Sequence, residues 1–323
     1  MRKSVLRGAM AVSALLAAVF VIGPYEPVDL AVRFDDSAIG ADPAAYLEQR
    51  EGVFDDIVPG AEKRIQWAGQ PGEKTPLSVV YLHGFSASAE ELRPVPDLVA
   101  KGLGANLYFA RLAGHGRSAT AMAGPTENDW MVDYAEAMAV GRAIGDEVLV
   151  IATSTGGAIA ALGAFDMAAS RALKGVTFVS PNFGINDAKA PLLTFPAARY
   201  WLPLVAGKTR GFTPLNDAQA RYWTESYPVT ALMPMAAMVK VAAQSRYGIV
   251  DTPALFIYAP EDAVVDADAT EKVAGGWGGE VTRHVVELTP ELDPMGHVLA
   301  GDIVSPAGTA PMVARILSWA RGL

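Results

Sequence analysis

The sequence predicts an α/β fold built on a mostly parallel, doubly wound sheet. From about residue 50 onward, short runs of apolar or β-branched residues alternate with helix-length segments. Most of these runs are continuously apolar, as expected for strands that helices cover on both faces. Such alternation is typical of a parallel sheet. The expected strands are Arg64–Ala68, Ser78–Leu82, Asn106–Ala110, Glu147–Ala152, Gly175–Ser180, Ala254–Ala259 and Arg283–Leu288. The expected helices are Ala89–Lys101, Glu127–Ile144, Gly156–Ala169, Asp266–Ala274 and Thr309–Arg321.

The composition favours a folded chain that binds neither nucleic acid nor a metal. Of the 323 residues, 51% are apolar and 19% are charged, which is typical of a protein with a sizeable core. The net charge of -9, without a visible run of Lys and Arg, argues against nucleic acid as a partner. The chain has no cysteine, which excludes disulfides and thiolate chemistry. Its 4 histidines show no ligand spacing, so we expect no metal and no cofactor.

The N-terminus predicts a membrane segment. Arg2, Lys3 and Arg7 precede the apolar run Gly8–Gly23, which Pro24 ends. A basic flank before an apolar run is typical of a secretion signal or a membrane anchor. The end of the run matches a cleavage site poorly, so residues 1–23 are expected to stay as an anchor; a cleaved signal and a buried helix are the alternatives. The remaining chain is expected outside the cytoplasm, anchored there, or secreted or periplasmic if the segment is cleaved.

Two stretches depart from the strand–helix alternation. Residues 24–49 contain several prolines and acidic residues, and they predict a linker with little regular structure. Residues 185–249 are rich in Pro, Met and aromatic residues, and they predict a helical cap, or lid, over the carboxyl edge of the sheet. Residues 50–184 and 250–323 then form the core. The apolar cap residues favour a hydrophobic ligand, or else they only pack the cap onto the core.

A serine at a tight turn is the first candidate for chemistry. The strand Glu147–Ala152 leads into Ser154, and a helix of small residues begins at Gly156. Strand, sharp turn with a central Ser, and helix are the context of a nucleophile elbow. Ala152 stands where the motif G-x-S-x-G has its first Gly, and it keeps that position small. The helix N-terminus favours negative charge beside Ser154. The alternative is an ordinary turn that happens to contain a serine.

The base that would activate this serine can be found by elimination. His83 and His115 precede Ser154 in the chain, and His284 lies within an expected strand. His297 lies in a loop after the last expected strand. The chain order nucleophile, acid, base is that of the α/β-hydrolase fold. Only His297 has both the position and the loop context of the general base.

The acid that orients this base is expected after the strand Ala254–Ala259. Asp262 is the first Asp beyond the strand end, and it is the preferred residue. Asp266 is the second choice, although it is better placed to cap the next helix. Glu261 is the third choice. Asp293 is close to the base in sequence, which does not establish that it is close in space.

An oxyanion hole requires two backbone N–H donors. The first is expected from Thr155, the residue after the nucleophile. The second is expected from Phe85, in the loop His83-Gly84-Phe85, where Gly84 allows the backbone to turn toward the site. His83 is expected to brace this loop rather than to take part in catalysis.

With these residues assigned, the chain resembles the α/β-hydrolase family. It is most similar to the monoacylglycerol lipase and lysophospholipase-like branch, also called serine aminopeptidase S33-like. The resemblance covers roughly residues 60–323 and rests on the motifs His83-Gly84-Phe85, Leu112-Ala113-Gly114-His115-Gly116-Arg117-Ser118, the elbow at Ser154, Asp262-Ala263-Val264-Val265 and Gly296-His297. It implies an eight-stranded core, a helical cap after the sixth strand and a metal-free acyl-enzyme mechanism. Ala152 and the N-terminal segment are departures from the family pattern.

The expected function is that of a serine hydrolase acting on carboxylic esters. The apolar cap favours lipid-like or other hydrophobic acyl esters as small-molecule substrates. One alternative is an exported aminopeptidase-like enzyme, in which Glu225 or Asp217 would capture a peptide's amino terminus. Another is a binding protein that uses the fold without catalysis.

Overall fold

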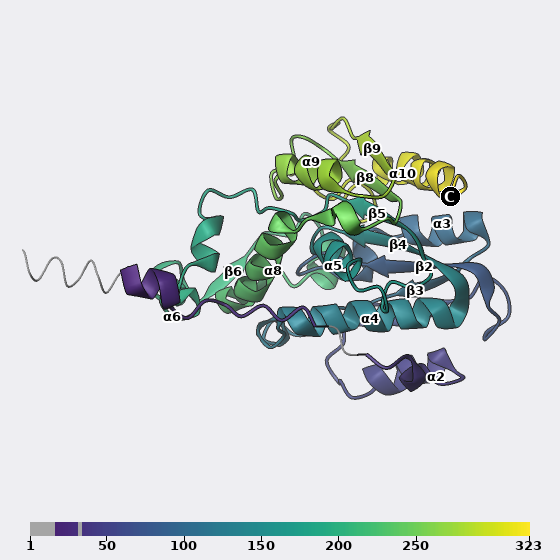
Figure 1. Ribbon diagram of the computed structural model, residues 1–323, viewed down its shortest axis with the longest axis horizontal. Helices are drawn as coiled ribbons and strands as arrows, with labels where there is room; N and C mark the ends of the chain where they lie inside the picture. The colour runs from purple at the N-terminus through teal and green to yellow at the C-terminus, as the bar shows by residue number, and fades with distance from the viewer. Residues whose placement is uncertain (1–16, 32–33) are drawn as a thin grey trace, which may run out of the picture.

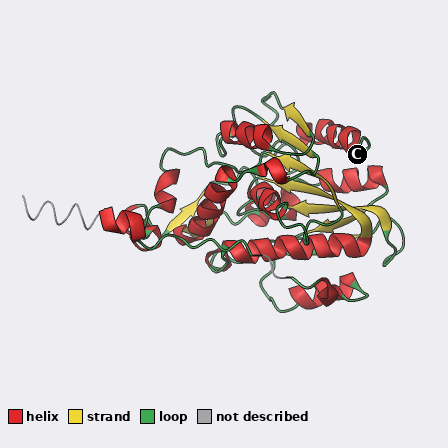
Figure 2. Ribbon diagram, viewed as in Figure 1, coloured by secondary structure: helices red, strands yellow, loops and turns green. Residues whose placement is uncertain are grey.

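A central seven-stranded sheet organises the chain (Figures 1 and 2). The computed structural model describes residues 17–31 and 34–323. The strand order is β1-β3-β2-β4-β5-β8-β9; β1 pairs antiparallel with β3, and the other pairs are parallel. The predicted doubly wound α/β fold is therefore confirmed. The strands are β1 (Arg64–Gln66), β2 (Thr75–Leu82), β3 (Asn106–Phe109), β4 (Gly145–Thr153), β5 (Leu173–Val179), β8 (Ala254–Tyr258) and β9 (Val281–Val285).

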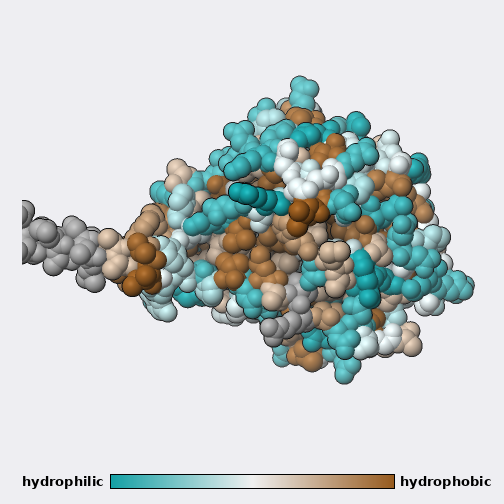
Figure 3. Space-filling model, in the orientation of Figure 1, coloured by the Kyte–Doolittle hydropathy of each residue, from teal (hydrophilic) through white to brown (hydrophobic). Residues whose placement is uncertain are grey.

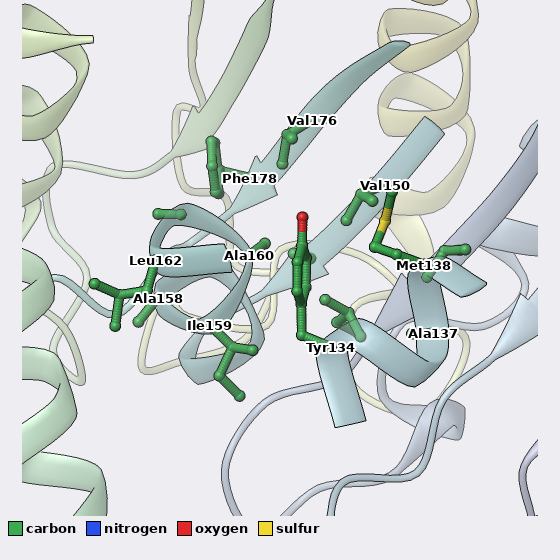
Figure 4. Packing of buried hydrophobic residues seen from close by; sticks show 14 of the residues in the cluster. Tyr134, Ala137, Met138, Val150, Ala158, Ile159, Ala160, Leu162, Val176 and Phe178 are labelled. Carbon is green, nitrogen blue, oxygen red and sulfur yellow. The ribbon is translucent and has the colours of Figure 1, made fainter. Parts of the chain in front are cut away.

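Helices cover both faces of this sheet and complete two apolar cores. Successive side chains of a strand point to opposite faces. Val150 of β4 packs in the larger core, together with Tyr134 and Met138 of α4 (Figure 4). Its neighbour Leu149 packs in the second core, against α3 and α10. The main helices are α2 (Pro43–Glu51), α3 (Val95–Leu103), α4 (Glu127–Ile144), α5 (Thr155–Gly163), α8 (Leu232–Gln244), α9 (Ala267–Gly276) and α10 (Pro306–Ala320).

Small residues let α5 lie close to the sheet and to α4. A Cβ on Gly163 would stand 2.3 Å from a ring carbon of Tyr134, and one on Gly157 would stand 2.8 Å from Pro181 Cβ. α4 itself spans the predicted range, because Thr126 and Asp129 form a capping box at its N-terminus. The close packing of α5 fixes the direction in which the turn before it points.

The segment between β5 and β8 is less helical than expected. It contains α6 (Ala198–Val205), α7 (Asp217–Tyr222) and α8, but also an antiparallel pair, β6 (Thr209–Gly211) and β7 (Ser226–Pro228). Met235 and Met238 of α8 are buried in the larger core. These two methionines therefore pack the segment onto the sheet, which was the alternative to ligand contact.

Several expected element boundaries are wrong for local reasons. The sheet has seven strands rather than the eight that the resemblance implies, and the chain before β1 forms a turn at residues 59–60 instead of a further strand. The expected helix Ala89–Lys101 is divided at Pro94, since a residue that precedes proline is disfavoured in helical geometry.

Residues 24–49 include a short 3₁₀-helix, Asp36–Ile39, and most of α2. Asp42 caps α2 and Pro43 opens it, which is a start signal that the linker interpretation missed.

The expected membrane anchor is not supported. Within residues 17–31 and 34–323, none of the helices has the length and apolar character needed to cross a bilayer. This finding counts against an N-terminal anchor and against the exported, anchored location derived from it; residues 1–16 of the expected segment lie outside the described residues. The short helix at 17–22 exposes Val19, Phe20, Val21 and Ile22. A brown, hydrophobic area next to the grey atoms is visible in Figure 3. Phe20 packs edge-on against Phe195, with ring centroids 5.7 Å apart.

The packing of α5 gives a stability prediction. Gly163→Ala should lower the free energy of unfolding by about 1–3 kcal/mol, because the added methyl overlaps Tyr134 in a core without free volume. Gly276→Ala, at the end of α9, is the matched control: a Cβ there meets nothing within 4 Å and should be neutral or stabilising. Urea denaturation of both variants tests this. Equal stability of the two variants would contradict the proposed packing of α5 on α4.

Candidate active site

Ser154 occupies a strained turn between β4 and α5. Its backbone has φ 52° and ψ -119°, which is uncommon for a residue with a side chain. A Cβ on Gly156 would stand 2.5 Å from the carbonyl oxygen of Leu82, so only glycine fits at this position. Ala152 is fully buried within β4 between β2 and β5, where a methyl group is accommodated. The turn therefore has the shape of a nucleophile elbow although its first glycine is replaced.

The structure brings the three predicted residues Ser154, His297 and Asp262 into one hydrogen-bonded row. His297 Nε2 lies 3.0 Å from Ser154 Oγ, and His297 Nδ1 lies 2.8 Å from Asp262 Oδ2. All three residues are buried. They follow β4, β9 and β8 respectively, so three strand ends converge at the carboxyl edge of the sheet.

The surrounding hydrogen bonds distinguish Asp262 from the other candidate acids. Its Oδ1 accepts the N–H groups of Val264 and Val265, at 2.8 and 2.9 Å, which leaves Oδ2 directed at His297. Asp266 instead caps α9, and Glu261 is exposed. The second choice in the sequence thus serves the structural role that its position indicated.

Asp293 has a role that sequence reasoning did not assign. Its Oδ2 accepts the backbone N–H of His297 at 3.1 Å and that of Val298 at 2.9 Å. Ser180 Oγ donates to the carbonyl oxygen of His297 at 2.7 Å. Both the backbone N–H and the carbonyl oxygen of His297 therefore have fixed partners. Asp293 is close to His297 in sequence, and the two residues are in contact. The contact is with the backbone of His297 and not with its ring.

The environment of His297 favours its protonated form. Burial opposes a charged ring, but the hydrogen bond and charge of Asp262, with the charges of Glu91 and Asp293, outweigh burial and raise the pKa of His297 above its usual 6.5. A ring with this bias accepts a proton from Ser154 Oγ more readily than an isolated imidazole would. The same bias would stabilise an imidazolium formed when the ring accepts a proton.

The loop expected to supply the second oxyanion donor is braced by His83. Leu112 donates its N–H to His83 Nε2 at 3.1 Å, so the ring proton is on Nδ1, which lies 2.8 Å from the carbonyl oxygen of Gly84. Burial and the neighbouring His115 hold the pKa of His83 well below its usual value, so the ring is neutral. Because Gly84 C=O and Phe85 N–H belong to one peptide plane, this bond sets the direction of the Phe85 N–H.

The two expected oxyanion donors are free to bind a ligand. Among the hydrogen bonds of the described residues, none uses the backbone N–H of Phe85 or of Thr155. Thr155 is the first residue of α5, where the backbone N–H groups have no partner within the helix. Donors at such a position can stabilise negative charge.

The segment between β5 and β8 directly contacts residues 83–86, which we term the oxyanion loop after the role expected of Phe85. Tyr227 of β7 packs edge-on against Phe85, with ring centroids 5.4 Å apart, and Thr224 donates its N–H to the carbonyl oxygen of Ser86 at 2.7 Å. Asn182, which follows β5, donates its side-chain N–H to Thr155 Oγ1 at 3.3 Å. The surroundings of Ser154 are therefore formed jointly by strand ends and by this segment.

Residues 79–310 match the model of a family described as the alpha/beta hydrolase family. The chain belongs to the alpha/beta hydrolase family. The match covers most of the chain and includes Ser154, Asp262 and His297. No curated protein matches its sequence significantly. Family membership accords with the strand order and with the turn at Ser154.

Solved structures of lipases are similar in fold to this alpha/beta hydrolase. One of the metagenome-derived lipolytic enzymes LipS and LipT is 21% identical, with 83% of this chain and 100% of that chain covered and a TM-score of 0.67. Monoglyceride lipase from Saccharomyces cerevisiae is 10% identical, with 81% and 91% covered and a TM-score of 0.62. Monoacylglycerol lipase from Paleococcus ferrophilus is 13% identical, with 81% and 99% covered and a TM-score of 0.56. At these identities the neighbours show a shared fold.

Asp262→Asn should slow the reaction of Ser154 with a fluorophosphonate probe by about 10⁴-fold, with the fold retained. Asn presents an N–H to His297 and favours the tautomer that cannot accept the serine proton. Asp266→Asn is the matched control and should react at the parent rate, because Asn also caps helices. Labelling rates measured on the folded proteins decide the matter. An Asp262→Asn rate close to that of the parent would remove Asp262 from the site.

The labelling rate should also depend on pH through His297. The protonated ring cannot accept the Ser154 proton, so the rate should fall as the pH decreases through the pKa of His297. Because that pKa is raised, the midpoint is expected above pH 6.5. A pH series of labelling rates measures it. A midpoint below 6.5 would show that burial, and not Asp262, dominates the surroundings of the ring.

Proposed function

We propose that this alpha/beta hydrolase is a serine hydrolase that cleaves carboxylic esters, with Ser154 as nucleophile, His297 as general base and Asp262 as the orienting acid. The observation that carries the proposal is the row Ser154–His297–Asp262, with its distances of 3.0 and 2.8 Å. A serine hydroxyl becomes an effective nucleophile only when a base is within hydrogen-bond reach of its oxygen. A binding protein without catalysis would not require this arrangement.

The reaction has two halves. In the first, Ser154 Oγ attacks the ester carbonyl carbon, and its proton passes to His297 Nε2. The carbonyl oxygen becomes an oxyanion, which the N–H groups of Phe85 and Thr155 receive. The tetrahedral intermediate collapses, the ester C–O bond breaks, and His297 returns the proton to the leaving alcohol. In the second half, His297 takes a proton from water, whose oxygen attacks the acyl-enzyme carbonyl carbon. The bond from that carbon to Ser154 Oγ breaks, His297 returns the proton to Ser154 Oγ, and the carboxylic acid leaves.

The substrate class we propose is a lipid-like or other hydrophobic acyl ester. A small apolar cluster of Met122, Tyr227 and Ala231, with Phe85 packed against it, lies next to the oxyanion loop. Apolar side chains at this point favour a hydrophobic group near the reacting carbonyl. The similar structures described above include monoglyceride lipases, which agrees with this class. In this proposal residues 185–249 act as the cap, and residues 50–184 and 250–323 form the catalytic core.

The peptidase alternative receives no support. Glu225 and Asp217, which would capture a peptide's amino terminus, are both exposed. An acidic group that recognises an ammonium is more effective when it is partly desolvated beside the site. We therefore retain the esterase proposal alone.

The test is covalent labelling of the full chain with a fluorophosphonate probe, beside Ser154→Ala and the matched control Ser118→Ala. Ser118 is an exposed serine outside the site. The parent and Ser118→Ala should be labelled, and Ser154→Ala should not. A folded parent that is not labelled, or labelling that persists in Ser154→Ala, would reject the proposal.

The substrate class is tested with chromogenic esters of short, medium and long acyl chains, together with aminoacyl substrates. We expect turnover of the acyl esters, with kcat/KM increasing from short to medium chains as more apolar surface is buried. Exclusive turnover of the aminoacyl substrates would reject the ester proposal while leaving the serine mechanism intact.

A further inference from the structure

Glu91 is a buried acidic residue that the reaction as described does not use. It ends the 3₁₀-helix Ala89–Glu91 after β2, and only 2% of it is exposed. Its neighbour Glu90 forms ion pairs with Arg64 and Arg93. Among the described residues, by contrast, no Lys or Arg side chain pairs with Glu91. A carboxylate buried without a cation is costly for folding, so its position calls for an explanation.

The hydrogen bonds of Glu91 lead to both halves of the candidate site. Its Oε2 accepts the backbone N–H of Gly84 at 2.7 Å, in the oxyanion loop. The same atom lies 3.3 Å from the hydroxyl of Tyr81, which lies 3.2 Å from Thr153 Oγ1. Thr153 directly precedes Ser154. Glu91 therefore connects the oxyanion loop to the end of the strand that carries the nucleophile.

The carboxyl group of Glu91 is also adjacent to Ser154 in space. A Cβ on Gly84 would stand 2.8 Å from Glu91 Oε1 and 3.1 Å from Ser154 Cβ. Both groups therefore border the space that a side chain on Gly84 would occupy. On the other side, a Cβ on Gly301 would stand 2.7 Å from the carbonyl oxygen of Glu91. The loop that follows His297 thus packs on the Glu91 backbone.

The Gly84 bond complements the brace supplied by His83. His83 holds the carbonyl oxygen of Gly84, and so fixes the peptide plane that contains the Phe85 N–H. Glu91 holds the N–H of Gly84, and so fixes the preceding plane. Glycine has more backbone freedom than any other residue, so one bond on each side of Gly84 is needed to define the direction of the Phe85 N–H.

We propose that Glu91 is a positioning residue for acyl transfer, which holds the oxyanion loop through the Gly84 N–H and adds a further negative charge, beside those of Asp262 and Asp293, to the surroundings of His297. The inference rests on the proposed serine esterase function, which it extends. Glu91 acts through Gly84 and His297, and the chemistry assigns it no direct contact with the ester.

The charges around Glu91 give the proposal its pH dependence. Burial raises the pKa of Glu91 to about 7, against the opposing effects of the Gly84 N–H, the charge of His297 and the Tyr81 hydroxyl. His297 in turn faces Asp262 and Asp293 as well as Glu91. Glu91 is therefore ionised in part near pH 7, and its ionised form makes His297 more basic. Removal of the Glu91 charge should lower the pKa of His297 and shift the acid limb of kcat/KM to lower pH.

Two substitutions separate the hydrogen bond from the charge. Glu91→Gln keeps an oxygen that can accept the Gly84 N–H but removes the charge. Glu91→Leu removes both. Glu90→Gln is the matched control, because it changes the adjacent residue of the same helix, whose partners are Arg64 and Arg93.

The decisive measurement is an NMR titration of His297 in the full chain, which is feasible because the chain has 4 histidines. We expect the pKa of His297 to fall by about one unit in Glu91→Gln, with the acid limb of kcat/KM moving by the same amount and kcat staying within several-fold of the parent. In Glu91→Leu, kcat should fall about 10²-fold or more, with a smaller change in KM. Glu90→Gln should match the parent in both measurements.

An unchanged pKa of His297 in Glu91→Gln would overturn the proposal, and so would an unchanged kcat in Glu91→Leu. If Glu91→Leu does not fold, Glu91→Gln still tests the proposal, because it keeps the hydrogen bond to Gly84 and removes only the charge, so a shift in the acid limb of kcat/KM follows from that charge. A parent that neither reacts with the fluorophosphonate probe nor hydrolyses esters would instead reject the proposed function. In that case the titration still shows whether the Glu91 charge reaches His297.

Discussion

The close approach of backbones at the turn between β4 and α5 is the constraint on which the rest of the site depends. Gly156 lies against the carbonyl oxygen of Leu82, and Ser154 has a positive φ. This geometry directs Ser154 Oγ away from the sheet, toward the loops that follow β8 and β9. The geometry is strained, and it persists because the surrounding packing leaves the turn no alternative. α5 can hold this position only because its residues facing α4 and Pro181 are small.

Parallel topology then places the chemical partners of Ser154. Strands of a parallel sheet present their carboxyl ends at one edge, so residues far apart in sequence meet there. Asp262 and His297 are separated from Ser154 by more than the length of the segment between β5 and β8, yet their side chains form one row. Fixed partners around that row hold each group in a single orientation: Val264 and Val265 for Asp262, and Asp293 for His297.

Three buried acidic side chains lie around His297. Asp262 contacts its ring, Asp293 holds its backbone, and Glu91 lies beyond Gly84. Taking so many carboxylates out of water destabilises the fold unless each has donors directed at it. Here each has at least one backbone N–H or a hydroxyl. Glu91 both accepts the Gly84 N–H and raises the pKa of His297. A change at this residue therefore alters the oxyanion loop and the charge around the imidazole together.

The sequence by itself determined the alternation of strands and helices, the turn at Ser154 and the chain order Ser154, Asp262, His297, because these features are local patterns of apolar, small and turn-forming residues. The capping box of α4 was likewise local and set its start. Tertiary structure decided the rest: the seven-stranded sheet, the choice of Asp262 over Asp266, and the positions of Glu91 and Asp293. Glu90-Glu91 looks from sequence like the solvated start of a helix. Only the packing of Gly84 and Gly301 against Glu91 buries it, because burial depends on segments that are distant in the chain.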